Sequence, residues 1–178
     1  NDSINGGAGN DIISAGGGDD QITVASGSDT VTGGAGADTI VVSSGATAVI
    51  TDLGAGGSVD IVTVASGSTV QATAAGSWTA SSATSNAGTF SIDASGFNVS
   101  VASATGANGF TITDSGAASN INGSGNADTI TGGAGNDIIN GFVGADIVDG
   151  GDGIDNISVT GTSVDLNHAS DDQLIRVE

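Results

Sequence analysis

The sequence lacks several residue types on which other proteins rely. Its 178 residues contain no cysteine, so a disulfide framework is excluded. There is no lysine and one arginine, Arg176, against 19 aspartates and a single glutamate, Glu178. Because phosphate groups are bound by cationic side chains, this balance excludes nucleic acid as a partner and disfavours an anionic membrane surface. A net charge of −19 at pH 7 instead calls for a cation.

Proline, methionine and tyrosine are also absent, and aromatic residues number five. No run of about 18 apolar residues is present, so we expect no membrane insertion. No signal peptide is visible. The first residues match only the end of a repeat, so we expect a fragment or processed product of a longer protein. A secreted fold can be held by metal in place of disulfides, so the missing cysteines do not argue for the cytosol.

What is abundant is an aspartate at every ninth residue, in two series. A branched apolar residue lies two positions after each one, as in G-G-A-G-N-D-I-I-S at residues 6–14 and G-G-A-G-N-D-I-I-N at residues 132–140. This pattern is the nonapeptide G-G-x-G-x-D-x-U-x, which predicts a parallel β-roll with calcium in its turns. The predicted metal-site aspartates are Asp2, Asp11, Asp20, Asp29, Asp38, Asp128, Asp137, Asp146 and Asp155, and the glycines are Gly7, Gly9, Gly16, Gly18, Gly27, Gly34, Gly36, Gly133, Gly135, Gly144, Gly151 and Gly153.

The chemistry of the repeat favours calcium over other metals. Glycines allow positive φ and expose carbonyl oxygens, while the aspartate closes the turn. Two nonapeptides complete one coil, so turns 18 residues apart should stack and together offer carboxylates and carbonyls to one ion. Ca²⁺ accepts 6–8 such oxygens, whereas Mg²⁺ requires tighter octahedral geometry. Zinc is excluded because cysteine is absent and His168 is the only histidine.

The 18-residue rule predicts about five bridged Ca²⁺ sites. The expected pairs are Asp2 with Asp20, Asp11 with Asp29, Asp20 with Asp38, Asp128 with Asp146, and Asp137 with Asp155. Asp29 should next face Thr47, where the carboxylate is lost and Val49 keeps the apolar register. Two carboxylates about 4 Å apart repel by about 4 kcal/mol at an effective dielectric of about 20. Because each strand supplies few apolar side chains, we expect folding to depend on calcium.

The chain divides into three predicted segments. Residues 1–50 form a first calcium-binding β-roll, residues 51–113 a metal-free β-rich segment, and residues 114–178 a second calcium-binding roll. The middle is expected to bury Trp78, Phe90, Phe97 and Phe110 as its core, because no ion clamps its coils. Apolar residues from Ile112 to Leu166 recur every nine residues, which indicates one continuous solenoid as an alternative to separate units.

Two local features of the second roll carry expectations of their own. Residues 170–174 resemble a degenerate last copy of the repeat, with Asp172 in the metal position. Phe142 occupies a turn position, either as a tolerated substitution or as a contact to a neighbouring module.

These motifs resemble the RTX family of secreted, glycine-rich, calcium-binding repeat proteins, over about residues 1–41 and 123–158. The resemblance implies export of the unfolded chain through a one-step secretion channel and folding in calcium outside the cell. It also implies a bacterial origin at the cell surface or in secretions. This chain departs from the family at Thr47 and Ser119, where the aspartate is missing and metal binding is in doubt.

Two function classes remain open. The first is a calcium-dependent structural module of a bacterial surface-layer or sheath-like assembly, whose partners are neighbouring copies or domains of the same protein. The second is the calcium-folded module of a secreted adhesin or exoenzyme whose active domain lies elsewhere. The chain itself is not expected to be an enzyme, because the aspartates are accounted for by the repeat and His168 with Asp165 lacks a recognisable pocket. The outward residues of the repeat are too mixed for an ice-binding threonine file.

Overall fold

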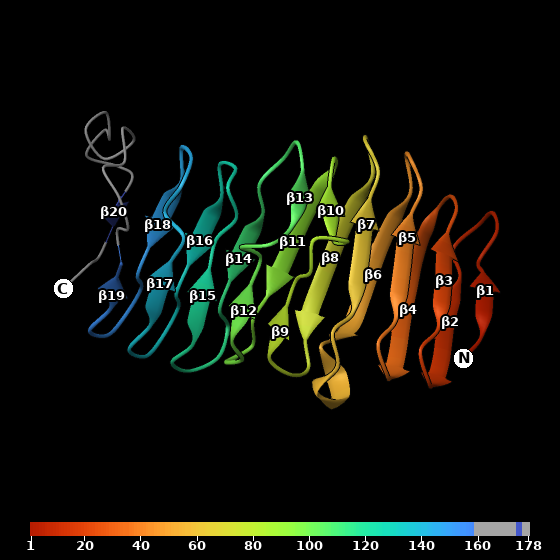
Figure 1. Ribbon diagram of the computed structural model, residues 1–178, viewed down its shortest axis with the longest axis horizontal. Coiled ribbons are helices and arrows are strands. Elements are labelled where there is room, and N and C mark those ends of the chain that lie inside the picture. The colour runs from red at the N-terminus through yellow and green to blue at the C-terminus, as the bar shows by residue number, and fades with distance from the viewer. Residues whose placement is uncertain (159–173, 176–178) are drawn as a thin grey trace.

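The computed structural model describes residues 1–158 and 174–175. The strands are parallel and stack into a β-solenoid of about 8 turns with almost no helix (Figure 1). The expected all-β, parallel-solenoid class is therefore confirmed, and the coils run continuously from the first repeat block through the middle to the second. Within the described residues, no helix has the length and apolar character needed to cross a membrane.

Three parallel sheets form the faces of the solenoid. The longest, with nine strands, contains β2 (Ile12–Gly17), β4 (Ser28–Ala35), β6 (Thr47–Leu53), β8 (Thr69–Ala74), β11 (Thr89–Asp93), β14 (Thr111–Thr113), β16 (Thr129–Thr131), β18 (Ile147–Asp149) and β20 (Leu174–Ile175). The six-stranded sheet contains β1 (Ser3–Asn5), β3 (Gln21–Val24), β5 (Thr39–Val42), β7 (Ile61–Val64), β10 (Ser85–Asn86) and β13 (Thr105–Gly106). The five-stranded sheet contains β9 (Trp78–Thr79), β12 (Val99–Ser100), β15 (Asn120–Asn122), β17 (Ile138–Asn140) and β19 (Asn156–Ile157). A short 3-10 helix, η1 (Ala55–Gly57), interrupts the connection after β6.

In the two repeat blocks the coils stack at the predicted interval. Ile4 pairs with Ile22, and Ile22 pairs with Ile40, so each apolar residue of the repeat lies over its counterpart one coil earlier. In the second block Ile112, Ile130 and Val148 form the same kind of file in the nine-stranded sheet. The branched residue two positions after each repeat aspartate points inward, and such files, together with Val24 and Val42, form the core of the rolls.

The middle of the molecule has a different cross-section. Its coils contribute a strand to all three sheets, as β10, β11 and β12 do, whereas the repeat blocks contribute to two. The coils are longer there, since Thr39 pairs with Ile61 and Val99 with Ile121. A three-sided coil encloses more space than a two-sided one, and larger side chains fill it. The rings of Trp78, Phe90 and Phe110 stack in a row, with centroids 6.3 Å and 5.4 Å apart.

Three expectations about the core need comment. Phe97 was predicted to be buried but is 38% exposed, because it lies in the turn before β12 while Val99 takes the inward position. Val49 is also exposed, and Ile50 is buried in its place. Phe142 is buried in the core and so is not a surface contact to another module.

The error at Val49 comes from one extra residue in the coil. Ser28 pairs with Thr47 and Asp29 with Ala48, so Thr47 does not face Asp29 as expected. The tight turn in which Ala46 donates to the Ser43 carbonyl adds this residue before β6. A shift of one residue turns every side chain of a strand to the opposite face. The predicted boundaries at residues 50 and 113 stay a prediction.

Candidate metal centre

The turns of the repeat depend on glycines with left-handed backbone. Every glycine predicted for the metal sites has positive φ, from 83° at Gly7 to 136° at Gly153. The stacking is also too close for a side chain at several of these positions. A Cβ on Gly27 would lie 1.8 Å from the carbonyl oxygen of Gly9 in the preceding coil. The turns therefore bring carbonyl oxygens of one coil directly against the backbone of the next.

The repeat aspartates form a ladder of hydrogen bonds along each edge of the solenoid. In all five predicted pairs, one carboxylate oxygen (Oδ1) of the later aspartate accepts the backbone N–H of the earlier one, 18 residues before: Asp20 from Asp2, Asp29 from Asp11, Asp38 from Asp20, Asp146 from Asp128, and Asp155 from Asp137. The pairing of turns is thus as predicted. Each carboxylate is held against the turn of the preceding coil.

The second carboxylate oxygen of these residues has a different environment. In Asp11, Asp20, Asp29, Asp137 and Asp155 the Oδ2 atom is buried and has no hydrogen-bond partner. Buried polar atoms in folded proteins are almost always satisfied, and a buried unpaired carboxylate is costly. A repeated set of unsatisfied anionic oxygens beside exposed carbonyls fits a hard divalent cation. Within the described residues no three acidic or histidine side chains converge, so backbone carbonyls must complete any such site.

The electrostatics of the turns agree with this interpretation. Burial raises the pKa of Asp38, Asp128 and Asp137 above the ordinary aspartate value, although hydrogen bonds from neighbouring amides oppose it. For Asp137 the nearby charges of Asp155 and Asp114 raise the pKa further. The ionised carboxylates are thus destabilised by dehydration and by one another. A bound cation would remove both penalties.

One repeat turn satisfies its aspartate within the protein. The Oδ2 atom of Asp128 accepts the Ser124 amide at 2.6 Å, and the Ser124 hydroxyl lies 3.0 Å from both carboxylate oxygens. Ser124 occupies the second turn position, where the consensus has glycine. The need for a cation is therefore weaker at this turn than at turns whose Oδ2 is unsatisfied.

Several carboxylates near the candidate sites were not predicted from the nine-residue pattern. Asp60 is buried, its Oδ1 accepts the Asp38 amide and its Oδ2 accepts the Gly54 amide. It continues the ladder 22 residues after Asp38, a spacing that the nine-residue repeat does not predict. The signal was present, because the buried Val62 follows Asp60 by two residues as in the repeat. Asp52, near the end of β6, and Asp114, directly after β14, are further carboxylates outside the nine-residue series.

A second ladder, also missed, uses the residue before the aspartate. The side-chain carbonyl of Asn10 accepts the Ser28 amide, and that of Asn136 accepts the Ile154 amide. Asp19 does the same for Ala37. In each case the partner lies 18 residues later, so this position ties each turn to the following coil, while the repeat aspartate ties it to the preceding one.

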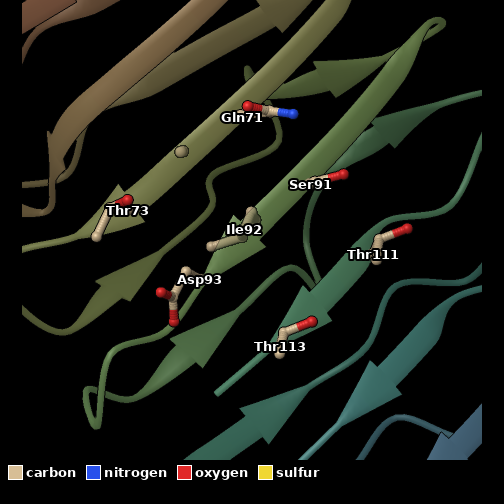
Figure 2. A pocket seen from close by; sticks show the side chains of 8 residues that line it. Gln71, Thr73, Ser91, Ile92, Asp93, Thr111 and Thr113 are labelled. Atoms are coloured by element: carbon tan, nitrogen blue, oxygen red, sulfur yellow. The ribbon is translucent and has the colours of Figure 1, made fainter. Parts of the chain in front are cut away.

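A shallow pocket on the outer face of the nine-stranded sheet shows no catalytic arrangement (Figure 2). It lies over β8, β11 and β14 and is lined mainly by Gln71, Thr73, Ser91, Thr111 and Thr113, with Asp93 as the one ionisable side chain. Partial burial opposes ionisation of Asp93, but hydrogen bonds from Ser115 and Ser95 outweigh it and keep its pKa below the ordinary value. Asp93 is therefore ionised at neutral pH and cannot donate a proton.

Some predicted features lie outside the described residues, namely Asp172, His168 and Asp165. Leu174 pairs with Val148 in the nine-stranded sheet. The metal-binding role of Asp172 stays a prediction.

Comparison with known families supports the interpretation of the repeats. A family model described as RTX calcium-binding nonapeptide repeat (4 copies) matches residues 1–31, 18–47 and 122–157. These ranges contain the ladders of repeat aspartates and leave out most of the three-sided middle. Comparisons with curated proteins and with solved structures found no match. The chain therefore carries RTX calcium-binding nonapeptide repeats, in two blocks that continue into one parallel β-solenoid.

Proposed function

We propose that this chain is a calcium-dependent structural module of a bacterial cell-surface assembly, such as a surface layer or sheath, and that it folds on binding Ca²⁺ outside the cell. The observation that carries the proposal is the set of buried, unpartnered Oδ2 atoms at repeat positions in both blocks. The proposed ligands are the repeat aspartates together with carbonyls of the glycine turns, holding about five ions or more.

The energetics favour a fold that is conditional on calcium. A domain is stable by only about 5–15 kcal/mol, and each close pair of buried carboxylates opposes folding by about 4 kcal/mol at an effective dielectric of about 20. Calcium at about tenfold over its Kd stabilises the folded state by about 1.4 kcal/mol per site. Five such sites add about 7 kcal/mol, which is the size of a whole domain's stability. Low cytosolic calcium would then keep the chain unfolded, and high external calcium would fold it.

Circular dichroism of the chain in chelator, Ca²⁺ and Mg²⁺ tests the calcium switch. In chelator the spectrum should be that of an unfolded chain, and millimolar Ca²⁺ should produce a cooperative β transition because each ion clamps two turns. Magnesium at the same concentration should do much less, since the irregular carbonyl–carboxylate turns do not suit its octahedral geometry. The same β spectrum and melting temperature in excess chelator would contradict the proposal.

The assembly role has its own support and its own test. RTX repeats are structural elements, and the solenoid is a continuous rod whose shallow pocket lacks a proton donor. A surface assembly should appear in electron micrographs of the purified protein as ordered arrays with Ca²⁺ and as dispersed particles in chelator. Dispersed particles in both conditions would instead favour the alternative, a calcium-folded module of a secreted adhesin or exoenzyme.

A further inference from the structure

We propose that residues 114–119 form an additional calcium site, in which Asp114 replaces the aspartate that the repeat lacks at Ser119. The site would use Asp114 and Asp137 as carboxylate ligands, with carbonyl oxygens of the turn. It rests on the proposed function, because the ion is the same, but it assigns a ligand from a different position of the repeat.

The register of the strands identifies Asp114 as the first residue of a turn. Thr113 pairs with Thr131, and the Asp114 amide donates to the Thr131 carbonyl, so Asp114 stacks on Gly132. Gly132 opens the consensus turn at residues 132–137. By the same alignment Ser119 stacks on Asp137, and it donates its amide to Asp137 Oδ1 at 2.7 Å. The turn at residues 114–119 therefore has its carboxylate at the first position and a serine at the sixth.

Both carboxylates are bound to this one turn and both are incompletely satisfied. Asp114 Oδ1 accepts the amides of Gly116 at 2.8 Å and of Gly96 at 2.6 Å. Asp114 and Asp137 are 3% and 0% exposed, and the Oδ2 atom of each is buried without a hydrogen-bond partner. Both side chains border the same pair of glycines, because a Cβ on Gly133 would lie 3.6 Å from Asp114 Cβ and a Cβ on Gly132 would lie 2.7 Å from Asp137 Oδ2. The two unsatisfied oxygens thus belong to neighbouring anions in one environment.

The first and sixth positions of a consensus turn lie close together. A Cβ placed on Gly132 would lie 2.7 Å from Asp137 Oδ2, and one on Gly33 would lie 2.3 Å from Asp38 Oδ2. In these two turns a side chain at the first position would therefore approach the carboxylate of the sixth, whereas the turns at residues 15–20 and 24–29 hold Ala15 or Val24 at the first position together with the aspartate at the sixth. With the smaller Ser119 at the sixth position, an aspartate at the first can direct its carboxylate into the same space.

Asp52, near the end of β6 and hydrogen-bonded to Gly33, shows that an aspartate beside a first-position glycine is not sufficient. It lies at the corresponding position at the other end of the middle segment, where its two oxygens accept the amides of Gly33 and Gly34 at 3.1 Å and 2.7 Å. The next ladder carboxylate, Asp60, is likewise satisfied on both oxygens. The described residues therefore place unsatisfied oxygens at Asp114 and Asp137 but not at Asp52 and Asp60.

Native mass spectrometry and calorimetric titration with Ca²⁺ test the site by counting ions per chain. Asp114→Asn should bind one ion fewer than the wild-type chain. Asp93→Asn is the matched control, because it removes a charge beside the same turn from a carboxylate that Ser115 already satisfies, and it should keep the full number. The double variant Asp114→Gly with Ser119→Asp restores the consensus positions and should recover the lost ion.

The outcomes separate this site from the proposed function. Full stoichiometry in Asp114→Asn, or an equal loss in Asp93→Asn, would overturn the site while calcium binding stands. If Asp114→Asn does not fold, the double variant decides: wild-type folding and ion count support the site, and a missing ion overturns it. A wild-type chain that takes up no calcium would overturn the proposed function itself.

Discussion

At the scale of the residue, the carboxylates of the ladder differ in how many turns depend on them. Asp20 is 1% exposed, accepts the Asp2 amide, and donates its own amide to Asp38. Asp2 is exposed, and its part in the ladder is the backbone amide that it donates to Asp20. An interior aspartate is therefore shared between two stacked turns, whereas Asp2 serves one.

Replacement of Asp20 by alanine should consequently reduce calcium binding more than replacement of Asp2. Asp20→Ala removes the carboxylate that accepts the Asp2 amide and whose charge contributes to the raised pKa of Asp38 in the following turn. We expect it to weaken two sites, whereas Asp2→Ala weakens one. Isothermal titration calorimetry of the two variants and the wild-type chain measures the difference. Equal losses of bound calcium in the two variants would show that the sites do not share ligands.

Glycine positions allow a second prediction, about backbone stacking. Gly27→Ala places a methyl group 1.8 Å from the Gly9 carbonyl oxygen at a φ of 111° and should destabilise the chain strongly. Gly45→Ala is the matched control, because its φ is 81° but nothing lies within 4 Å of the new Cβ. Strain of this kind alone costs on the order of 1–3 kcal/mol. Thermal melts in saturating Ca²⁺ should show a larger loss for Gly27→Ala, and similar melting temperatures would contradict the close stacking.

At the scale of the element, the middle coils are stabilised differently from the repeat turns. Trp78 of β9 and Phe90 of β11 are each 1% exposed, and both carboxylate oxygens of Asp60 accept protein amides. The Trp78 indole also donates to the Asp60 carbonyl at 3.0 Å. Side-chain packing thus holds the coils together in the three-sided middle. The repeat blocks, in contrast, contain carboxylate oxygens without a hydrogen-bond partner.

Truncation of the aromatic row should therefore destabilise the chain even when calcium is saturating. Phe90→Ala should cost about 3–5 kcal/mol, the usual range for removing a buried phenylalanine. Phe97→Ala changes a side chain that is 38% exposed and should cost much less. Chemical denaturation at high Ca²⁺ compares the two. Equal stabilities would mean that the aromatic row does not support the middle coils.

At the scale of the whole molecule, negative charge dominates the response to solution conditions. The net charge is −19 at pH 7, and burial raises the pKa of Asp38, Asp60, Asp128 and Asp137. Each of these carboxyls holds its proton more tightly in the folded chain than in the unfolded one, so its protonation favours folding. Asp93, whose pKa is lowered, contributes stability that is lost as the pH falls.

The pH dependence should consequently reverse between calcium and chelator. In chelator the chain should gain stability as the pH falls from neutral towards the raised pKa values, which lie above the ordinary aspartate value of about 4. In Ca²⁺ the stabilisation by the metal should decrease over the same range, because protonated carboxyls no longer bind the ion. The folded fraction from circular dichroism in chelator and the melting temperature in Ca²⁺, each measured from pH 7 to pH 4, test this. Parallel curves would show that the titrating carboxyls are not the calcium ligands.

The parts of this protein that repeat at constant length could be predicted from the residue pattern. A nine-residue period identified the strands, the inward apolar file and the glycines with positive φ, and doubling it predicted which aspartates stack, such as Asp11 with Asp29. These features follow from the sequence because each copy encodes the same local turn and strand, and equal coils can stack in only one register.

Where the coils change length, only the tertiary structure shows which residues pair between coils and which side chains point inward. One added residue before β6 buried Ile50 instead of Val49, and a coil of 22 residues brought Asp60 onto the ladder above Asp38. The third sheet face and the outward Phe97 belong to the same longer coils. Counting along the chain cannot supply such pairings, because the register between unequal coils is set by which side chains pack inward across the stack.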